Sequence, residues 1–287
     1  MISRRRFITA GMLTAAGIAY LTQETQAARA TKKKKIGLQL YSVRDALKND
    51  LEGTLKTLAS IGYTWLELAD YKDGKFYGKT PKEFKKLIKG LGMELIASHT
   101  GVTAETIDNT IEDHKAAGIK YIIQPWLAED RRTSAEHYKK VCGELNQYGE
   151  KCKKEGLKFG YHNHAFEFDT VDGRIGYDLM LKETDPALVL FEMDVYWVRK
   201  GGADPLNYFE KFPGRFELLH FKDMDNTPEE GNTVIGKGVI DFGAICKAAP
   251  QSGMKYFFVE LEKTKDITSV EGVKQSFEYL NGAAFIH

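Results

Sequence analysis

The feature that most constrains the fold of this chain is a regular alternation between two kinds of segment. From Lys35 onward, short apolar runs rich in β-branched and aromatic residues alternate with longer amphipathic stretches rich in Lys and Glu. The first kind predicts buried strands and the second predicts helices. Eight strands are expected, at Ile36–Tyr41, Trp65–Ala69, Glu94–His99, Tyr121–Trp126, Lys158–Asn163, Val189–Asp194, Phe216–Phe221 and Tyr256–Leu261.

A predicted helix follows each predicted strand, and several helices open near Thr, Ser, Asp or Pro, which favour a first turn. Eight β/α units without a Gly/Ser-rich linker fit a closed (β/α)8 TIM barrel better than an open doubly wound sheet. No GxGxxG follows the first strand and no P-loop occurs, so the sequence lacks the usual signature motifs of nucleotide-binding α/β folds. The helices are expected at Leu51–Ile61, Pro81–Leu91, Ala104–Ala117, Ser134–Glu155, Gly176–Glu183, Pro205–Phe212, Phe242–Ala249 and Val270–Leu280.

The first thirty residues form a different kind of sequence. Ser3-Arg4-Arg5-Arg6-Phe7-Ile8 opens an apolar run that ends at Leu21, and Ala28-Arg29-Ala30 follows it. These are the parts of a signal peptide, the paired arginines resemble a twin-arginine signal, and the apolar run is too short to span a bilayer. We therefore expect residues 1–30 to direct export to the periplasm; an uncleaved anchor helix is the alternative.

Cleavage after Ala30 would leave residues 31–287 as a single TIM-barrel catalytic domain with no stable membrane anchor. Those 257 residues are close to the roughly 250 residues typical of the fold. The whole chain has 41 Lys and Arg against 40 Asp and Glu, so no basic surplus predicts nucleic-acid binding, and a small partner is expected. The three cysteines are odd in number and show no CxxC spacing, which argues against a disulfide framework.

Polar side chains end several of the otherwise apolar strands. In a TIM barrel these carboxyl ends meet at one mouth, where active sites lie. One such residue is commonly structural, but carboxylates and imidazoles on four successive strands would be costly to bury without a counter-ion. The residues concerned are His162 and His164 near strand five, Glu192 and Asp194 on strand six, His220 and Lys222 on strand seven, and Glu260 on strand eight, with His99 ending strand three.

A divalent cation is the simplest counter-ion for this ring. Its mixture of carboxylates and imidazoles suits Mn²⁺, Mg²⁺, Co²⁺ or Zn²⁺. No cysteine lies near the predicted ligands, which argues against a structural thiolate zinc site. The sequence therefore predicts one divalent metal ion and leaves its identity open.

Segments at these strand ends resemble those of the xylose-isomerase-like sugar isomerase/epimerase barrels. The resemblance runs from Ile36 to about Leu280, and its members include sugar epimerases, inosose dehydratases and hydratases or lyases of keto-sugars. It implies the same fold but does not specify a substrate. The segments are Gln39-Leu40-Tyr41-Ser42-Val43-Arg44-Asp45, Tyr161-His162-Asn163-His164-Ala165-Phe166-Glu167-Phe168, Asp194-Val195-Tyr196-Trp197, His220-Phe221-Lys222-Asp223, Gly236-Lys237-Gly238-Val239-Ile240-Asp241-Phe242 and Phe258-Val259-Glu260.

The resemblance implies a metal site with one ligand from each of strands five to eight. Asp194, His220 and Glu260 occupy the last three positions. Many relatives have Glu-Asn-His at the end of strand five, whereas this chain has His162-Asn163-His164. The fourth ligand is therefore Glu167, His162 or His164, and Glu167 is favoured because a further carboxylate would balance the metal charge and serve as a base.

The same resemblance implies proton transfer next to a carbonyl, with Glu260 and Glu167 as acid and base. Lys222 is expected to stabilise the enolate oxygen, although a surface pair with Asp223 would also explain it. His99 is expected to protonate a leaving hydroxyl or orient a substrate hydroxyl, or else to be a structural residue of the barrel rim. Substrate contacts are expected from Trp126, His164, Tyr196 and Trp197.

Export favours a neutral sugar or keto-sugar, because phosphorylated sugars are mainly intracellular. We rank hydratase or lyase action on a keto-sugar or keto-glycoside above simple ketose isomerisation or 3-epimerisation. A non-catalytic sugar-binding protein has no need for the charged ring, and a DNA-repair endonuclease of the related barrels is disfavoured by near-neutral charge and export. The oligomeric state is left open between a monomer and a homo-oligomer.

Overall fold

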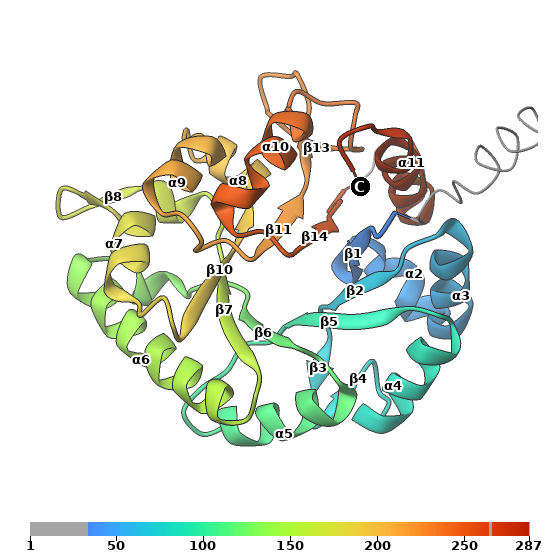
Figure 1. Cartoon of the computed structure of the whole chain (residues 1–287), viewed down its shortest axis with the longest axis horizontal. Helices are drawn as coiled ribbons and strands as arrows, with labels where there is room; N and C mark the ends of the chain where they lie inside the picture. Colours follow the sequence, from blue (N-terminus) through green and yellow to red (C-terminus); the bar gives the residue numbers. More distant parts are fainter. Residues whose placement is uncertain (1–33, 264–265, 287) are drawn as a thin grey trace, which may run out of the picture. The chain divides into compact units, whose positions relative to one another are not determined.

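The computed structural model describes residues 34–263 and 266–286, so the predicted signal segment at residues 1–30 lies outside the described residues. Within the unit Lys35–Ile286, eight parallel strands close into a barrel in the order β1-β14-β11-β10-β7-β6-β5-β2 (Figure 1). The predicted (β/α)8 architecture is confirmed. The barrel strands are β1 (Gly37–Gln39), β2 (Trp65–Leu68), β5 (Glu94–His99), β6 (Tyr121–Gln124), β7 (Lys158–His162), β10 (Val189–Asp194), β11 (Leu218–Phe221) and β14 (Tyr256–Val259).

Helices follow the barrel strands and lie outside the ring (Figure 1). All eight predicted helices are present, and their ends differ from the prediction by no more than a few residues. Favourable first turns explain several starts: α4 begins with Pro81 after a reciprocal capping pair between Thr80 and Glu83. These helices are α3 (Leu51–Ile61), α4 (Pro81–Gly90), α5 (Ile107–Ala117), α6 (Ala135–Lys154), α7 (Gly176–Glu183), α9 (Pro205–Lys211), α10 (Phe242–Ser252) and α11 (Ser269–Gly282).

Short elements that the periodicity did not predict lie in the connections between the barrel strands and these helices. The first strand ends at Gln39, two residues earlier than expected, because a 3-10 turn begins at Leu40 and the Gln39 side chain accepts a hydrogen bond from the Tyr41 N–H. The other additions are helices α2 (Arg44–Asn49) and α8 (Val195–Lys200), 3-10 turns η1 (Leu40–Val43), η2 (Glu129–Arg131) and η3 (Phe166–Phe168), and hairpins β3 (Tyr71–Lys72) with β4 (Lys75–Phe76), β8 (Thr170–Val171) with β9 (Arg174–Ile175), and β12 (Asp223–Met224) with β13 (Asn232–Thr233).

Alternation along the strands separates the barrel interior from the layer beneath the helices. On β10, Phe191 and Met193 pack in the large core shared with the helices, whereas Leu190 belongs to a smaller cluster within the barrel. Glu192 and Asp194 continue the Leu190 face because side chains two residues apart share one face. The interior face is therefore apolar where the strand begins and charged where it ends.

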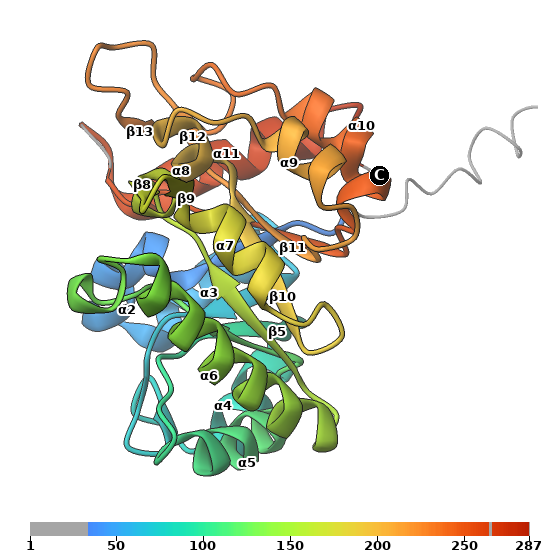
Figure 2. The same cartoon turned by 90° about the vertical axis from the view of Figure 1, so that its left-hand side faces the viewer.

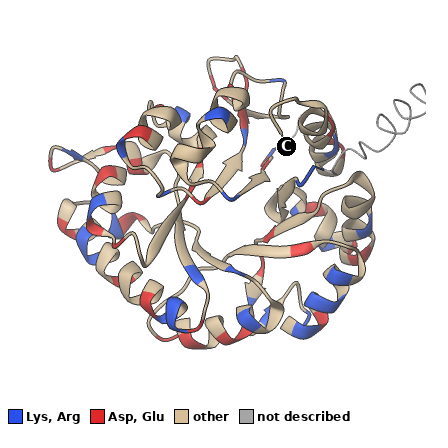
Figure 3. Ribbon diagram, viewed as in Figure 1, with Lys and Arg blue, Asp and Glu red and all other residues tan. Residues whose placement is uncertain are grey.

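Charged residues of both signs are spread along the outer helices (Figure 3), as expected from the near-neutral composition. The side view in Figure 2 shows the hairpin β12–β13 and the short helix α8 together at one end of the barrel. That end holds the carboxyl ends of the strands. Within the described residues, no helix has the length and hydropathy needed to cross a membrane.

Candidate active site

Polar side chains from six barrel strands or the residues that follow them meet inside the mouth. Parallel strands bring their carboxyl ends to the same side of the barrel, which explains why residues far apart in sequence converge. Most of these side chains are fully buried, and their charges are therefore expected to be paired. They are Glu67 on β2, His99 on β5, His162 on β7, Glu192 and Asp194 on β10, His220 on β11 with Lys222 just after it, and Glu260 just after β14.

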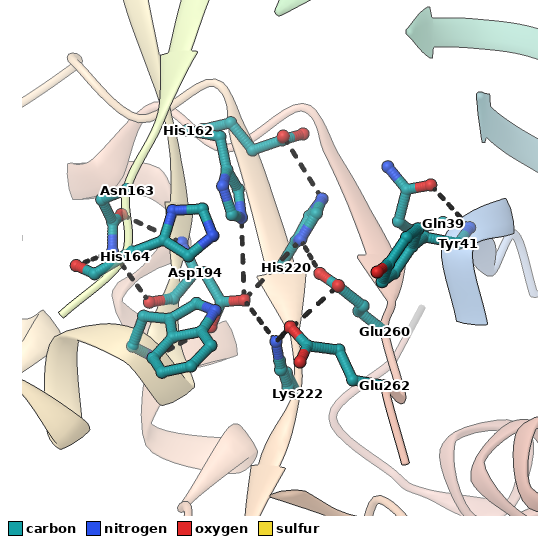
Figure 4. A network of polar contacts seen from close by, with 12 residues as sticks. Gln39, Tyr41, His162, Asn163, His164, Asp194, His220, Lys222, Glu260 and Glu262 are labelled. Atoms are coloured by element: carbon teal, nitrogen blue, oxygen red, sulfur yellow. Dashed lines mark hydrogen bonds and ion pairs between the residues drawn. The ribbon is translucent and has the colours of Figure 1, made fainter. Parts of the chain in front are cut away.

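Four of these residues form a compact set of potential metal ligands: His162, Asp194, His220 and Glu260 (Figure 4). One ligand atom from each lies within 4.8 Å of all the others. Ligand atoms at 2.0–2.2 Å from one ion lie roughly 3–4.4 Å apart, so only small adjustments separate this set from a coordination shell. Two of the atoms, Nε2 of His162 and Oδ2 of Asp194, are buried and make no hydrogen bond within the described residues. This donor set fits a divalent cation.

Asp194 is held in place by the backbone and side chains around it. The Asn163 amide accepts a hydrogen bond from the Asp194 N–H at 3.1 Å and donates one to the Asp194 carbonyl at 3.4 Å. Oδ1 of Asp194 accepts a hydrogen bond from the Trp197 N–H at 3.0 Å and so caps helix α8. The cap directs one oxygen to the helix and leaves Oδ2 facing the potential ligands.

Carboxylates lie against both ring nitrogens of His220. Its Nδ1 is 2.5 Å from Oε2 of Glu260, whereas its Nε2 is 2.6 Å from Oε2 of Glu67 and 3.3 Å from Oε2 of Glu192. Burial alone would lower the pKa of His220, but the Glu192, Glu67 and Glu260 carboxylates raise it well above its ordinary value. The contacts on Nε2 fix the plane of the ring and leave Nδ1 toward the potential metal site.

A second possible ligand group shares two histidines with the first and is formed by His99, His162, Glu192 and His220. Here two of the three imidazoles already have partners at Nε2: that of His99 is 2.6 Å from Oε2 of Glu192, and that of His220 contacts Glu67. The set that contains Asp194 and Glu260 is therefore the better candidate for a metal. His99 remains partly exposed, with 14% of its side chain accessible, and faces the cavity above.

Lys222 is fully buried among carboxylates, so it is not the surface partner of Asp223 that the sequence left open. Its ammonium donates a hydrogen bond to Glu262 and lies 3.7 Å from both Asp194 and Glu260. Burial opposes the charged form of each group, yet the Lys222 charge holds the pKa of both Asp194 and Glu260 well below their ordinary values. These carboxylates are thus ionised, as metal ligands must be.

A cavity of about 520 Å³ opens above these residues and reaches the surface. His162 and Glu260 lie at its base, and three aromatic rings, Tyr41, Trp126 and Trp197, form much of its wall. Its volume is typical of a small-molecule site. His99 and His164 also line the cavity, so the predicted contacts Trp126, His164 and Trp197 are all placed beside the candidate ligands.

Two predicted site residues lie elsewhere. The Glu167 carboxylate accepts hydrogen bonds from the Tyr161 hydroxyl at 2.6 Å and from the His164 N–H at 2.8 Å, and it belongs to neither ligand group. Burial raises its pKa to about 7. The Tyr196 hydroxyl donates to the Glu230 carbonyl, and its ring lies beside Lys222 and outside the cavity lining. The structure therefore makes Glu167 a support for the loop after β7.

Four residues of the site had no individual role in the sequence-based prediction: Glu192, which it named only as part of the charged ring, and Glu67, Glu262 and Tyr41, which it did not single out. A detectable signal existed for two of them, because Glu67 and Glu192 interrupt apolar strands and should not be buried alone. Glu262 and Tyr41 carry no such signal. Their positions depend on the turns that follow β14 and β1.

The fold and this polar mouth define a (β/α)8 barrel with a candidate active site at the carboxyl ends of its strands. The family model described as "Xylose isomerase-like TIM barrel" matches residues 55–283. The chain belongs to that family. The resemblance found in the sequence is thereby confirmed.

Individual relatives and solved structures carry the names of different proteins. Inosose dehydratase of Bacillus licheniformis is 28% identical over 151 residues, which cover 47% of this chain and only half, 50%, of that enzyme. A solved sugar phosphate isomerase/epimerase from Parabacteroides distasonis is 35% identical with a TM-score of 0.81, covering 91% of this chain and 98% of that one. The IolI protein, solved with a zinc atom, is 16% identical with a TM-score of 0.68, covering 85% and 95% of the two chains, and this likeness concerns the fold alone.

Proposed function

We propose that this protein is a divalent-metal-dependent enzyme that removes a proton next to the carbonyl of a keto-sugar. The main support is the buried set His162, Asp194, His220 and Glu260, which has two donor atoms without hydrogen bonds within the described residues and opens into a cavity with aromatic walls. Hydratase or lyase action on a keto-sugar or keto-glycoside is the favoured reaction. The inosose dehydratase relatives support the dehydratase side of this chemistry.

The metal would be held by His162, Asp194, His220 and Glu260. His162 replaces Glu167 as the fourth ligand because both Glu167 oxygens are already hydrogen-bonded and its carboxylate lies outside the ligand groups. When bound, the ion supplies Lewis-acid polarisation of the substrate carbonyl. Zinc in the IolI protein supports a metal in this class of barrel, while Mn²⁺, Mg²⁺, Co²⁺ and Zn²⁺ all remain compatible with the donor set.

Different residues of the chain then carry out the two proton transfers. Glu260, ionised and at the base of the cavity, takes the proton from the carbon beside the carbonyl, and Lys222 stabilises negative charge on the carbonyl oxygen. The C–H electron pair forms a carbon–carbon double bond when the C–O bond to the leaving group breaks. His99, backed by Glu192, gives a proton to that oxygen, so water or an alcohol departs; addition of water is the reverse step.

The lining of the cavity supports a neutral substrate. Among the described residues, Glu260 and Glu262 line it, whereas neither a lysine nor an arginine does. The two carboxylates of this lining would repel a phosphate. We therefore propose a neutral sugar, even though the Parabacteroides relative is named for sugar phosphates.

The test is turnover of methyl 3-keto-glucoside by the metal-loaded protein in D₂O, followed by NMR. Lyase action predicts release of methanol, whereas an isomerase or epimerase would return a rearranged sugar with deuterium beside the carbonyl. Glu260→Gln should lower the rate by roughly 10²–10⁴-fold, because the amide cannot accept the proton. Glu217→Gln, a carboxylate change at the opposite end of the barrel, serves as the matched control. Turnover of the probe by Glu260→Gln at the unmodified rate would exclude this mechanism.

We also propose that the protein acts in the periplasm after export as a folded chain. The support is the arginine pair, apolar run and small-residue site within residues 1–30. N-terminal sequencing of the protein from a periplasmic fraction should then begin near Thr31. An intact Met1 in the cytoplasmic fraction would contradict the proposal.

A further inference from the structure

A second cavity of about 520 Å³ adjoins the one at the metal-ligand set. The two share Tyr41 and Ala69, which follow β1 and β2. Each cavity alone has the volume of a small-ligand site. A single sugar ring beside the candidate ligands would therefore leave the second cavity to solvent.

Tyr41 forms the boundary between the cavities. Its side chain is 43% exposed, and the Arg44 guanidinium lies over its ring at 4.0 Å. Arg44 also donates hydrogen bonds to the carbonyls of Tyr41 at 2.8 Å and Glu262 at 3.0 Å. Because Glu262 lines the first cavity and Arg44 the second, these contacts fix the two relative to each other.

One residue in the wall of the second cavity is held in an unfavourable backbone conformation. Tyr77, in the loop after β4, has a φ of 50°, which is uncommon for a bulky residue. Its hydroxyl accepts a hydrogen bond from the Ala69 N–H at 3.2 Å, and its ring stacks on Phe84. Such strain persists where surrounding contacts enforce it, often at binding sites.

The remaining surface of the second cavity has the chemistry of a carbohydrate subsite. Leu40, Leu47 and Leu51 provide apolar area, and the exposed side chains of Lys48 and Asp70 add a donor and an acceptor. A sugar ring presents an apolar face and a rim of hydroxyl groups, which matches aromatic and aliphatic walls with a few polar groups.

We propose that the second cavity binds the leaving-group ring of a two-ring glycoside whose keto-sugar ring lies in the first cavity. This inference rests on the proposed function and narrows its substrate class from keto-sugars to keto-glycosides of at least two rings. The glycosidic oxygen would pass beside Tyr41. A lyase then releases a complete sugar from the second cavity.

A phosphate group is the competing occupant, because Arg44 and Lys48 both line the second cavity. The charges favour a sugar instead. Arg44 is already committed to two carbonyls and the Tyr41 ring, while Asp70 adds a carboxylate that would repel an anion.

The experiment compares a 3-keto-disaccharide of glucose with methyl 3-keto-glucoside, which carries the same reacting ring. The disaccharide should have a kcat/KM at least about tenfold higher, because it fills both cavities. Lys48→Trp, which places an indole in the second cavity, should remove most of this preference. Lys56→Trp on α3 lines neither cavity and should keep it. Equal kcat/KM for the two probes, or a preference unchanged in Lys48→Trp, would overturn the proposal.

Further measurements separate this inference from the proposed function. Competition by inorganic phosphate, lost in Lys48→Ala, would overturn the sugar assignment in favour of a phosphate site. If neither probe is turned over, the proposed function fails. Calorimetry with cellobiose and glucose then tests independently whether the second cavity binds a sugar ring. Binding of cellobiose about tenfold tighter than glucose, abolished in Lys48→Trp, would support the subsite; equal binding would overturn it.

Discussion

The two ends of the barrel use the same eight strands but place different demands on their interior side chains. Near the strand starts, Leu190, Leu218 and Tyr121 belong to a compact interior cluster. The Glu217 carboxylate at that end is bonded to Lys158 at 2.7 Å and Lys255 at 3.0 Å. At the mouth, buried charged groups instead retain oxygens and nitrogens without hydrogen bonds within the described residues.

We therefore expect residues at the base of the barrel to contribute mainly to stability and residues at the mouth to contribute mainly to function. Apolar packing and satisfied ion pairs at the base stabilise the fold without requiring another molecule. Polar atoms at the mouth are costly until a cation or substrate contacts them. Substitutions at the two ends should therefore affect different measurements.

The largest effect is expected from Asp194→Asn at the mouth. The amide can still cap α8, but it removes the negative charge facing the potential metal. Activity on a keto-sugar probe should fall by roughly 10³-fold, and metal measured by elemental analysis should fall below one ion per chain. The urea midpoint should change little. A variant with full metal content and normal activity would show that the ligand set is wrong.

Leu218→Ala tests the base of the barrel. This fully buried side chain lies in the interior cluster, so its truncation leaves a cavity and should lower the free energy of unfolding by about 2–5 kcal/mol. Activity per folded molecule should stay within about twofold of the unmodified enzyme. Urea unfolding and single-temperature rates measure the two quantities. A large loss of activity in the folded variant would contradict the claim that residues at the base affect stability and not function.

Glu67→Gln should give an intermediate effect, because Glu67 contacts His220 and not the substrate cavity. The neutral amide orients the imidazole less strongly, so metal affinity should fall by roughly 10–100-fold. The turnover rate at saturating metal should recover, which a loss of folding would not allow. Glu94→Gln, an exposed change at the start of β5, is the control.

The smallest effect is expected from Glu217→Gln at the base. Burial opposes ionisation, but Lys158 and Lys255 lower the pKa of Glu217. Its contribution to stability is therefore present above the unfolded-state pKa near 4.3, and it is lost as pH falls through the lower folded value. We expect a loss of about 1 kcal/mol at pH 7 that shrinks toward zero near pH 3, measured by urea unfolding.

The barrel and much of its mouth could be predicted from the sequence because both depend on local periodicity and strand ends. Asp194, His220 and Glu260 each end or follow an apolar run, and topology alone brings them together. Glu167 could not be placed in this way. It lies beyond β7 in a 3-10 turn, and its direction is decided by the Tyr161 hydroxyl and the His164 N–H.

Asp194 also limits how this molecule can change over evolution. Because one oxygen of the same carboxylate caps α8, the direction of the other is set by the helix backbone at Trp197. Insertion of a residue between positions 194 and 197 would turn that oxygen away. Length changes after Lys200, where α8 has ended, leave the cap intact. New loops can therefore be accepted beyond the helix, while the three-residue spacing from Asp194 to Trp197 in its first turn must be kept.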